Sequence, residues 1–156
     1  MNSTEIIFDP QLFSIWKKGF LPKDWLALYP TIFDSEDLRL ALSQPQYHFA
    51  EWFTAIHYFK LGWNALVEQY IYKPHARKLV IIEKYLGKEG VEFLRKSEGR
   101  GRIQPPDLFL YRGDEYFFGE IKMPSDKLRD EQKIFFESIE KHFNTSVSII
   151  YLKKRV

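Results

Sequence analysis

Residues 106–122, PDLFLYRGDEYFFGEIK, decide the fold expected for this chain. Residues 108–111 form a short apolar and aromatic run that favours a strand, and residues 116–122 form a second one. The polar turn between them contains Gly113, whose backbone is conformationally permissive. Pro124 ends the second strand because proline has no N–H for a strand ladder. The pattern predicts a β-hairpin.

This hairpin brings charged side chains to one end of a sheet. Glu120 and Lys122 point to one face and Ile121 to the other, because side chains alternate along a strand. Asp107 lies opposite Glu120 in a hairpin centred near residues 113–114. Two carboxylates at that spacing can share one divalent cation.

Mg²⁺, or Mn²⁺, fits this set because it takes one or two carboxylates together with waters and a substrate phosphate. Such an ion lowers the pKa of a bound water and stabilises charge on a phosphate. Lys122 would orient or deprotonate that water, and the carbonyl of Ile121 would be a further ligand. The alternative is an exposed ion pair between Glu120 and Lys122, with Asp107 as a turn residue. The ordered pattern around them disfavours it.

The motifs resemble those of the VRR-NUC group of PD-(D/E)xK nucleases, the restriction-endonuclease-like superfamily. The matching text is PPDLFLY, followed by YFFGEIKMPSDKLRDEQKIFF. Members show a PD strand, an E-x-K strand, a polar loop with a basic residue such as Lys127, and a glutamine on the next helix, here Gln132. Met123 stands where many members have glycine, a departure that removes no ligand.

The resemblance covers about residues 64–156. It implies a nuclease core with a mixed α/β sheet, preceded by an aromatic-rich helical extension over residues 1–63. It also implies a metal-dependent DNA endonuclease that acts by direct water attack, with branched or flapped DNA as the substrate suggested by the family. Gln132 would hold a phosphate or a metal-bound water.

The family usually draws another acid from a helix before the sheet, and two residues are candidates. Glu68 has apolar neighbours, and its segment, LVEQYIYKPHARK, resembles the leading helix of the group. Glu83 lies near the end of a helix that Gly87 terminates, where a negative charge is mildly unfavourable. Glu68 is preferred, and an ordinary surface glutamate remains the alternative for both.

Basic residues near these motifs are candidates for binding nucleic acid. Residues 1–72 hold 5 Lys/Arg and 8 Asp/Glu, whereas residues 73–156 hold 18 and 13. The half with the expected site is therefore the basic half, a distribution that phosphate binding predicts but that many other domains share. The candidate contacts are Arg100 and Arg102 in a glycine loop, Lys127 and Arg129 after the E-x-K strand, and His75 and Lys78, which could also orient Glu68.

Composition predicts one folded domain, or one domain with a helical extension. The chain has 156 residues, of which 45% are hydrophobic and 17% aromatic, and it has no cysteine. Disulfides and thiolate zinc sites are therefore excluded. No segment has the roughly 18 consecutive apolar residues of a membrane span, and the first residues lack the basic character of a signal peptide. We expect a soluble, intracellular protein.

The remaining elements follow from periodicity and turn residues. Residues 1–47 show short helical patterns broken by prolines, and residues 48–72 are expected to be largely helical, with a core-facing aromatic stripe. A helix to Leu86, a strand over 91–95, a helix over 130–143 and a strand over 146–152 complete the expected order.

Other functions remain open at this stage. The same fold could serve as a non-catalytic nucleic-acid-binding module. It could also be a defence or mobile-element effector that binds a protein partner through its N-terminal half, which contains all four tryptophans. A homodimer would suit a nuclease that cuts two strands.

Overall fold

The computed structural model describes residues 1–98 and 103–156 and shows a mixed α/β fold built on one sheet. The strands are β1 (Asn2–Phe8), β2 (Asn64–Val67), β3 (Leu108–Arg112), β4 (Glu115–Lys122) and β5 (Val147–Lys154). They lie in the order β1-β5-β4-β3-β2. The β1–β5 and β4–β5 pairs are parallel, and the β2–β3 and β3–β4 pairs are antiparallel. The expected mixed α/β class is confirmed.

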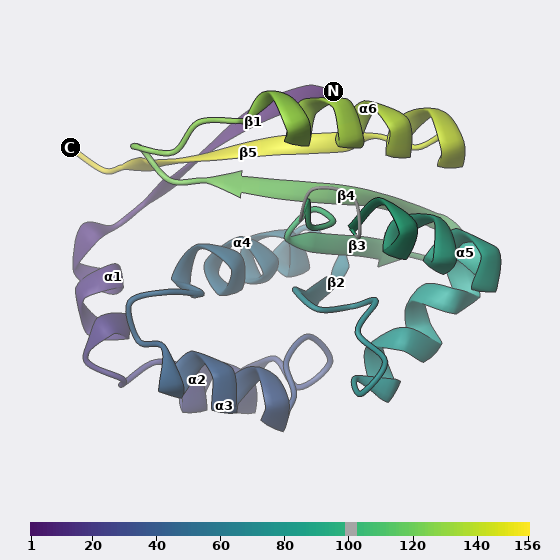
Figure 1. Ribbon diagram of the computed structural model, residues 1–156. Helices are drawn as coiled ribbons and strands as arrows, with labels where there is room; N and C mark the ends of the chain where they lie inside the picture. Colours follow the sequence, from purple (N-terminus) through teal and green to yellow (C-terminus); the bar gives the residue numbers. More distant parts are fainter. Residues whose placement is uncertain (99–102) are drawn as a thin grey trace.

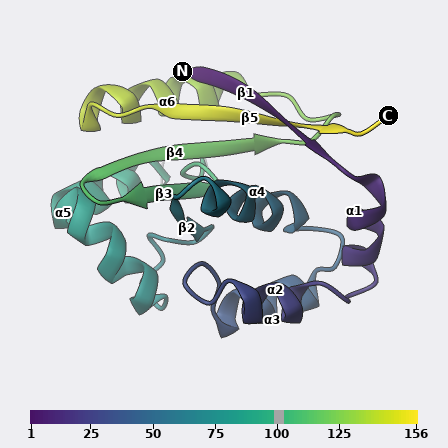
Figure 2. The same ribbon diagram turned by 180° about the vertical axis from the view of Figure 1, so that it is seen from behind.

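Helices cover both faces of this sheet. They are α1 (Pro10–Lys17), α2 (Pro22–Leu28), α3 (Ser35–Ser43), α4 (Phe49–Lys60), α5 (Ala76–Glu98) and α6 (Asp130–Phe143). One apolar core packs α1–α4 against one face of the sheet, and a second core packs α5 and α6 against the other. The α5–α6 layer is in front in Figure 1, and α4 is in front in the reverse view of Figure 2. The sheet is therefore the middle of three layers.

The central hairpin is confirmed. Leu108 pairs with Gly119 and Arg112 with Glu115, and the turn between β3 and β4 contains Gly113 with a φ of 54°. A positive φ is readily adopted by glycine. The expected helix over residues 130–143 and the strand after it are also present, as α6 and β5.

Two expectations for the N-terminal half were wrong. Residues 2–8, expected in a region of short helices, form the edge strand β1, with Ile6 and Phe8 buried on the α4 side. Residues 64–72, expected to continue a helix, contain strand β2 instead. Strand pairing to β5 and β3 overrides the weak local preference in both places.

The expected strand over residues 91–95 was also wrong. These residues lie in α5, where Val91 and Leu94 are buried at the spacing of a helix face. Gly87 has non-helical angles (φ 73°, ψ 167°), so two helical stretches meet there. The glycine was correctly expected to end the first stretch, but a second helix follows it instead of a strand.

The aromatic stripe of α4 faces the core, as expected. Phe49, Trp52 and Ile56 are buried, and the Trp52 ring stacks on Phe33 at 3.7 Å between centroids. Residues on both sides of the expected boundary at 63/64 contribute strands to one sheet. No helix in the described ranges combines the length and the apolar character that crossing a membrane requires.

Charged residues at the start of α3 connect the N-terminal half to α5. Asp34 caps α3, and with Asp37 it forms a reciprocal capping box. Arg77, near the start of α5, donates to Asp34 at 2.8 Å, and the next residue, Lys78, donates to Asp37 at 2.6 Å. Two cations from α5 thus meet two carboxylates from the start of α3.

We expect Asp34→Asn to lower the free energy of unfolding by about 1 kcal/mol at pH 7, because it removes the charge that faces Arg77. Burial alone would raise the pKa of Asp34, but the hydrogen bonds from Asp37 and Arg77 outweigh it and lower the pKa from 3.8 to about 2. The folded pKa is below the unfolded one, so this contribution is complete above 3.8 and disappears as pH falls through about 2. Urea unfolding of both proteins as a function of pH would measure it.

Glu36→Gln is the matched control, because Glu36 is an exposed carboxylate in the same helical turn, and within the described part of the chain its ion-pair partner is Arg39. Glu36→Gln should change the free energy of unfolding by no more than about 0.5 kcal/mol at all pH values. A pH-independent cost for Asp34→Asn would contradict the role given to its charge.

Candidate active site

Asp107 and Glu120 meet at the end of the central hairpin, as expected. The backbone N–H of Asp107 donates to Glu120 Oε1 at 3.3 Å, and the N–H of Ile121 donates to Asp107 Oδ2 at 2.9 Å. The side chain of Ile121 lies in the core on the α4 side, so its neighbours on β4 face the α6 layer. The register of two paired strands therefore places both carboxylates.

Lys122 and Gln132 complete a buried polar triangle with Glu120. Lys122 Nζ lies 3.2 Å from Glu120 Oε2 and donates to Gln132 Oε1 at 3.1 Å, while Gln132 Nε2 donates to Glu120 Oε2 at 2.9 Å. Gln132 also accepts from the N–H of Arg129 at 3.1 Å, which fixes it in the first turn of α6. The glutamine amide thus holds the amine and the carboxylate in fixed relative positions.

Glu68 joins this group, but from a turn and not from a helix. It follows β2 directly, and both Glu68 and Gln69 have left-handed backbone angles, with φ of 53° and 49°. The N–H of Glu68 donates to the carbonyl of Asp107 at 2.8 Å. Its carboxylate lies 2.8 Å from His48 Nδ1. Backbone pairing next to β3 thus brings Glu68 beside Asp107.

Glu51 is an acidic residue that helix α4 contributes to this cluster, and it was not among the candidates from the sequence. His48 precedes α4 and Glu51 lies in its first turn, and together with Glu68 they present ligand atoms within 4.8 Å of one another. His48 Nε2 lies 2.6 Å from Gln44 Oε1, so both ring nitrogens have partners. A histidine and a glutamate three residues apart at a helix start were the available signal, but the aromatic stripe around them indicated only core packing.

The four carboxylates act on one another electrostatically. Burial, and then the charges of Glu120, Glu51 and Glu68, raise the pKa of Asp107 well above its ordinary value. Burial, and then the charge of Glu68, raise the pKa of Glu51 to about 7. Burial likewise raises the pKa of Glu120, although Lys122 opposes it. Burial and the neighbouring carboxylates therefore both favour the protonated forms of these groups.

Burial alone would lower the pKa of His48, but the hydrogen bond and charge of Glu68 outweigh it and raise the pKa. A protonated His48 supplies one positive charge to the cluster, and Lys122 supplies another. A divalent cation would supply further positive charge, and carboxylate oxygens are the ligands that Mg²⁺ and Mn²⁺ prefer. Among the described residues, His48, Glu51 and Glu68 present ligand atoms close enough to one another to hold such an ion, and Asp107 and Glu120 stay predicted ligands beside them. The Ile121 carbonyl stays a predicted ligand.

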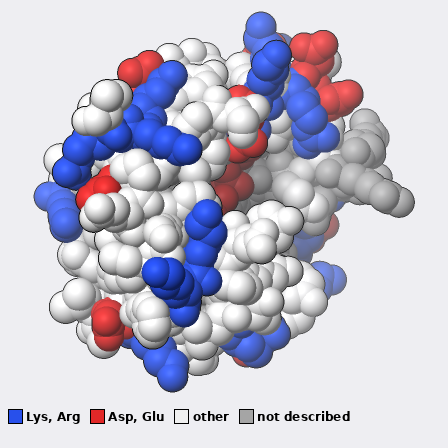
Figure 3. Space-filling view, turned by 90° about the vertical axis from the view of Figure 1, so that its left-hand side faces the viewer, with Lys and Arg blue, Asp and Glu red and all other residues white. Residues whose placement is uncertain are grey.

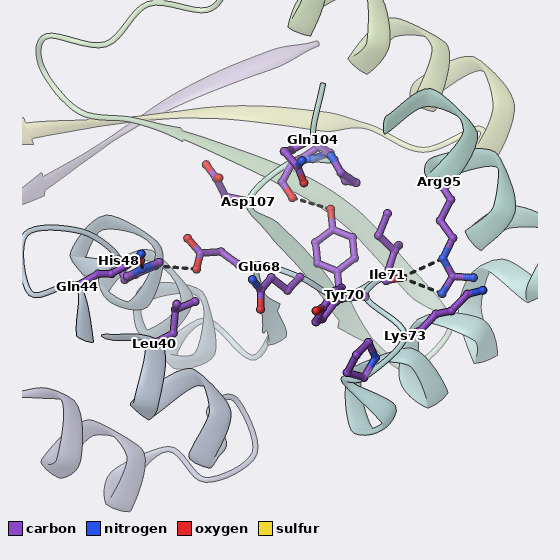
Figure 4. A pocket seen from close by; sticks show the side chains of 15 residues that line it. Leu40, Gln44, His48, Glu68, Tyr70, Ile71, Lys73, Arg95, Gln104 and Asp107 are labelled. Carbon is purple, nitrogen blue, oxygen red and sulfur yellow. Dashed lines mark hydrogen bonds and ion pairs between the residues drawn. The ribbon is translucent and has the colours of Figure 1, made fainter. Parts of the chain in front are cut away.

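A groove of about 1140 Å³ leads to this cluster. Glu68 and Asp107 lie at one part of its wall, and Lys73 and Arg95 line another, as Figure 4 shows. Figure 3 shows acidic side chains in a recess of one face, with Lys and Arg side chains on the surface on both sides of it. The groove gives an extended ligand access to the carboxylates.

The basic residues that the sequence predicted to bind nucleic acid differ in whether a ligand can reach them. Lys78 was expected to contact phosphate, but it is buried and bonded within the protein, so that expectation is wrong. Lys127 and Arg129 are exposed in the loop before α6, where a ligand can reach them. Arg100 and Arg102 lie outside the described residues.

His75 and Glu83 lie away from the contacts of the cluster. His75 is partly exposed and its ring packs near Tyr72, whereas the histidine that contacts Glu68 is His48. Glu83 lies within α5, and among the described residues it does not belong to the group of ligand atoms that contains Glu68. Of the two acids proposed from the sequence, the structure places Glu68 in the cluster.

Comparison with known proteins finds distant likenesses only. No family model matches the chain, and no curated protein matches it. Two similar solved structures are crystal structures of paFAN1, bound to 5′-flap DNA with a gap and a flap of two nucleotides or one. Their identities are 17% and 18%, over 78% and 91% of this chain, each with a TM-score of 0.36. The chain spans only 21% and 24% of those longer chains. Likeness at this level carries no function across.

We expect Glu51→Gln to stabilise the metal-free protein by roughly 1–3 kcal/mol at pH 8, because it removes one of four repelling charges. The pKa of Glu51 is raised from 4.5 to about 7, so its ionisation destabilises the fold increasingly as pH rises through this range. The gain should therefore be small at pH 5. Urea unfolding in EDTA at the two pH values would measure it.

Mn²⁺ should make the wild type more stable than Glu51→Gln. A cation that binds the folded state stabilises it, and the variant has one carboxylate fewer to bind that cation. We expect a smaller rise in Tm with Mn²⁺ for Glu51→Gln than for the wild type. An equal rise in both would show that Glu51 does not bind the ion.

Proposed function

We propose that this protein is a nuclease that hydrolyses phosphodiester bonds in DNA with the help of Mg²⁺ or Mn²⁺. The observation that carries the proposal is the meeting of Asp107, Glu120, Glu68 and Glu51 beside Lys122 at a groove. Repelling carboxylates with raised pKa values cost stability, and their arrangement is that of a ligand set for a hard cation.

Each residue of the cluster has a separate role in the proposed hydrolysis, set by its position. Asp107 and Glu120 would hold the cation, with Glu51 and Glu68 completing its acidic surroundings. A bound ion supplies charge stabilisation at the phosphate and lowers the pKa of the attacking water. Lys122, held by Gln132, orients that water and attracts a phosphate oxygen. The water oxygen would attack phosphorus and form the new P–O bond while its proton passes to solvent. The P–O bond to the leaving oxygen would break, that oxygen would take a proton from solvent, and no covalent intermediate with the protein would form.

DNA is the proposed substrate, and its branched or flapped forms are the first to test. Lys127 and Arg129, exposed just after β4, are suited to contact phosphates on either side of the cleaved bond. A homodimer and a protein partner for the N-terminal half stay predictions. A non-catalytic DNA-binding module on the same fold is the alternative that the following experiments separate.

We expect Glu51→Gln to lower the cleavage rate about 100-fold or more, because a group that organises charge at the reacting phosphate is lost. The measurement is single-turnover cleavage of linear, single-stranded, flapped and four-way DNA with Mg²⁺ or Mn²⁺. Glu83→Gln is the matched control: the same change outside the cluster should leave the rate within about twofold. Equal rates for wild type and Glu51→Gln would contradict the assignment.

We expect Lys122→Met to abolish cleavage while DNA binding in Ca²⁺ is retained. Lys127→Met should weaken binding and raise KM with little effect on kcat, since an exposed cation contributes to phosphate affinity and not to the reaction. Gel-shift and cleavage assays on the same DNA would separate the two effects. Binding without cleavage by the wild type in either metal would favour the non-catalytic module.

A further inference from the structure

Lys78 is a buried cation with no access to a ligand. Only 1% of its surface is exposed, although a lone ammonium in the protein interior is very costly. Asp37 compensates part of that cost by accepting from Lys78 Nζ at 2.6 Å. Asp37 itself also lies within 3.6 Å of Arg77 Nη2. The ion pair therefore joins α3 to the start of α5 in the interior.

The remaining hydrogen bonds of Lys78 go to the end of β2. Its ammonium donates to the carbonyls of Val67, at 2.5 Å, and Glu68, at 3.0 Å. All three donors of the ammonium thus have partners, two of them backbone groups beside the carboxylate cluster. Two of the three partners of the ammonium are therefore main-chain groups of the segment that carries Glu68.

The backbone that Lys78 holds is strained. Glu68 and Gln69 both have left-handed angles, which cost free energy for residues other than glycine and persist only where the surroundings enforce them. The N–H of Glu68 is fixed from the other side by the carbonyl of Asp107. The turn is held between β3 and Lys78, and its direction determines where the Glu68 carboxylate points.

We propose that Lys78 is a positioning residue of the carboxylate cluster. By binding the carbonyls of Val67 and Glu68 while Asp37 neutralises it, Lys78 fixes the left-handed turn that presents Glu68 to His48 and Asp107. Its effect on hydrolysis rests on the function proposed above, whereas its effect on the position of Glu68 does not.

In this role, Lys78 depends on residues from the N-terminal half of the chain. α3 supplies the anion that allows Lys78 to stay buried, and α4, with the residue before it, supplies Glu51 and His48. Residues of the expected helical extension therefore contribute to the cluster from two directions.

The test uses the full chain with Asp37→Asn and Lys78→Met combined, because removing both charges avoids leaving one buried and unpaired. The control is Asp34→Asn with Arg77→Met, which removes the neighbouring ion pair but no contact to the Glu68 backbone. Circular dichroism would verify that each variant is folded. If the first pair fails to fold, Lys78→Arg serves instead, since its wider head group cannot reproduce both carbonyl contacts.

The first readout is the ¹⁵N NMR signal of the His48 ring without metal, which reports the hydrogen bond to Glu68. We expect this signal to move in the Asp37/Lys78 variant to its position in Glu68→Gln, and to stay in place in the control. An unchanged signal would overturn the proposal whether or not the protein cuts DNA.

The second readout is a double-mutant cycle in Mn²⁺ affinity, measured by calorimetry. The Asp37/Lys78 variant should weaken Mn²⁺ binding about 10-fold, as loss of a supporting group around a metal does. In a Glu68→Gln background the same change should have less than about a twofold effect, because the role acts through Glu68. If the effects of the Asp37/Lys78 change and of Glu68→Gln on Mn²⁺ affinity were additive, the proposed role of Lys78 would be overturned.

Activity is read last and separately. The Asp37/Lys78 variant should lower kcat more than it changes KM for DNA, since groove contacts remain. If the wild type binds Mn²⁺ but cuts no DNA, the proposed function is wrong, while the NMR signal and the cycle still decide the role of Lys78.

Discussion

Repulsion among carboxylates that converge at one end of the sheet is the constraint around which this structure is organised. Asp107 and Glu120 arrive on paired strands, Glu68 on the turn after β2, and Glu51 on α4. Their pKa values rise where burial and neighbouring negative charge favour the proton. Such a cluster persists because the strands, two cores and an internal ion pair hold it in place.

Rigid backbone places most of this site. The N–H groups of Asp107, Ile121 and Glu68 all take part in hydrogen bonds among the site residues themselves. A shift of one residue in the β3–β4 register would turn Glu120 toward the core on the α4 side. The aromatic side chains of the hairpin, which pack against α5, resist such a shift.

The N-terminal half also helps to position the carboxylate cluster. Its aromatic core fixes α4 against the sheet, and α4 then presents Glu51 to the carboxylates that come from the other half. Asp34 and Asp37 at the start of α3 receive Arg77 and Lys78 from α5. Contacts made by residues far apart in the chain thus define the geometry of a site whose motif occupies one short stretch.

The sequence by itself determined the hairpin, the pairing of Asp107 with Glu120, the shared face of Glu120 and Lys122, and the helix that carries Gln132. These depend on alternation, turn chemistry and short spacing, which are local properties. Only the tertiary structure decided that residues 2–8 and 64–67 are strands, because their partners β5 and β3 lie far along the chain. It also decided that Glu51 and His48 belong to the site and that Lys78 lies inside the protein. Those roles arise from packing between distant elements, and no local pattern encodes which distant side chain a charged residue will meet.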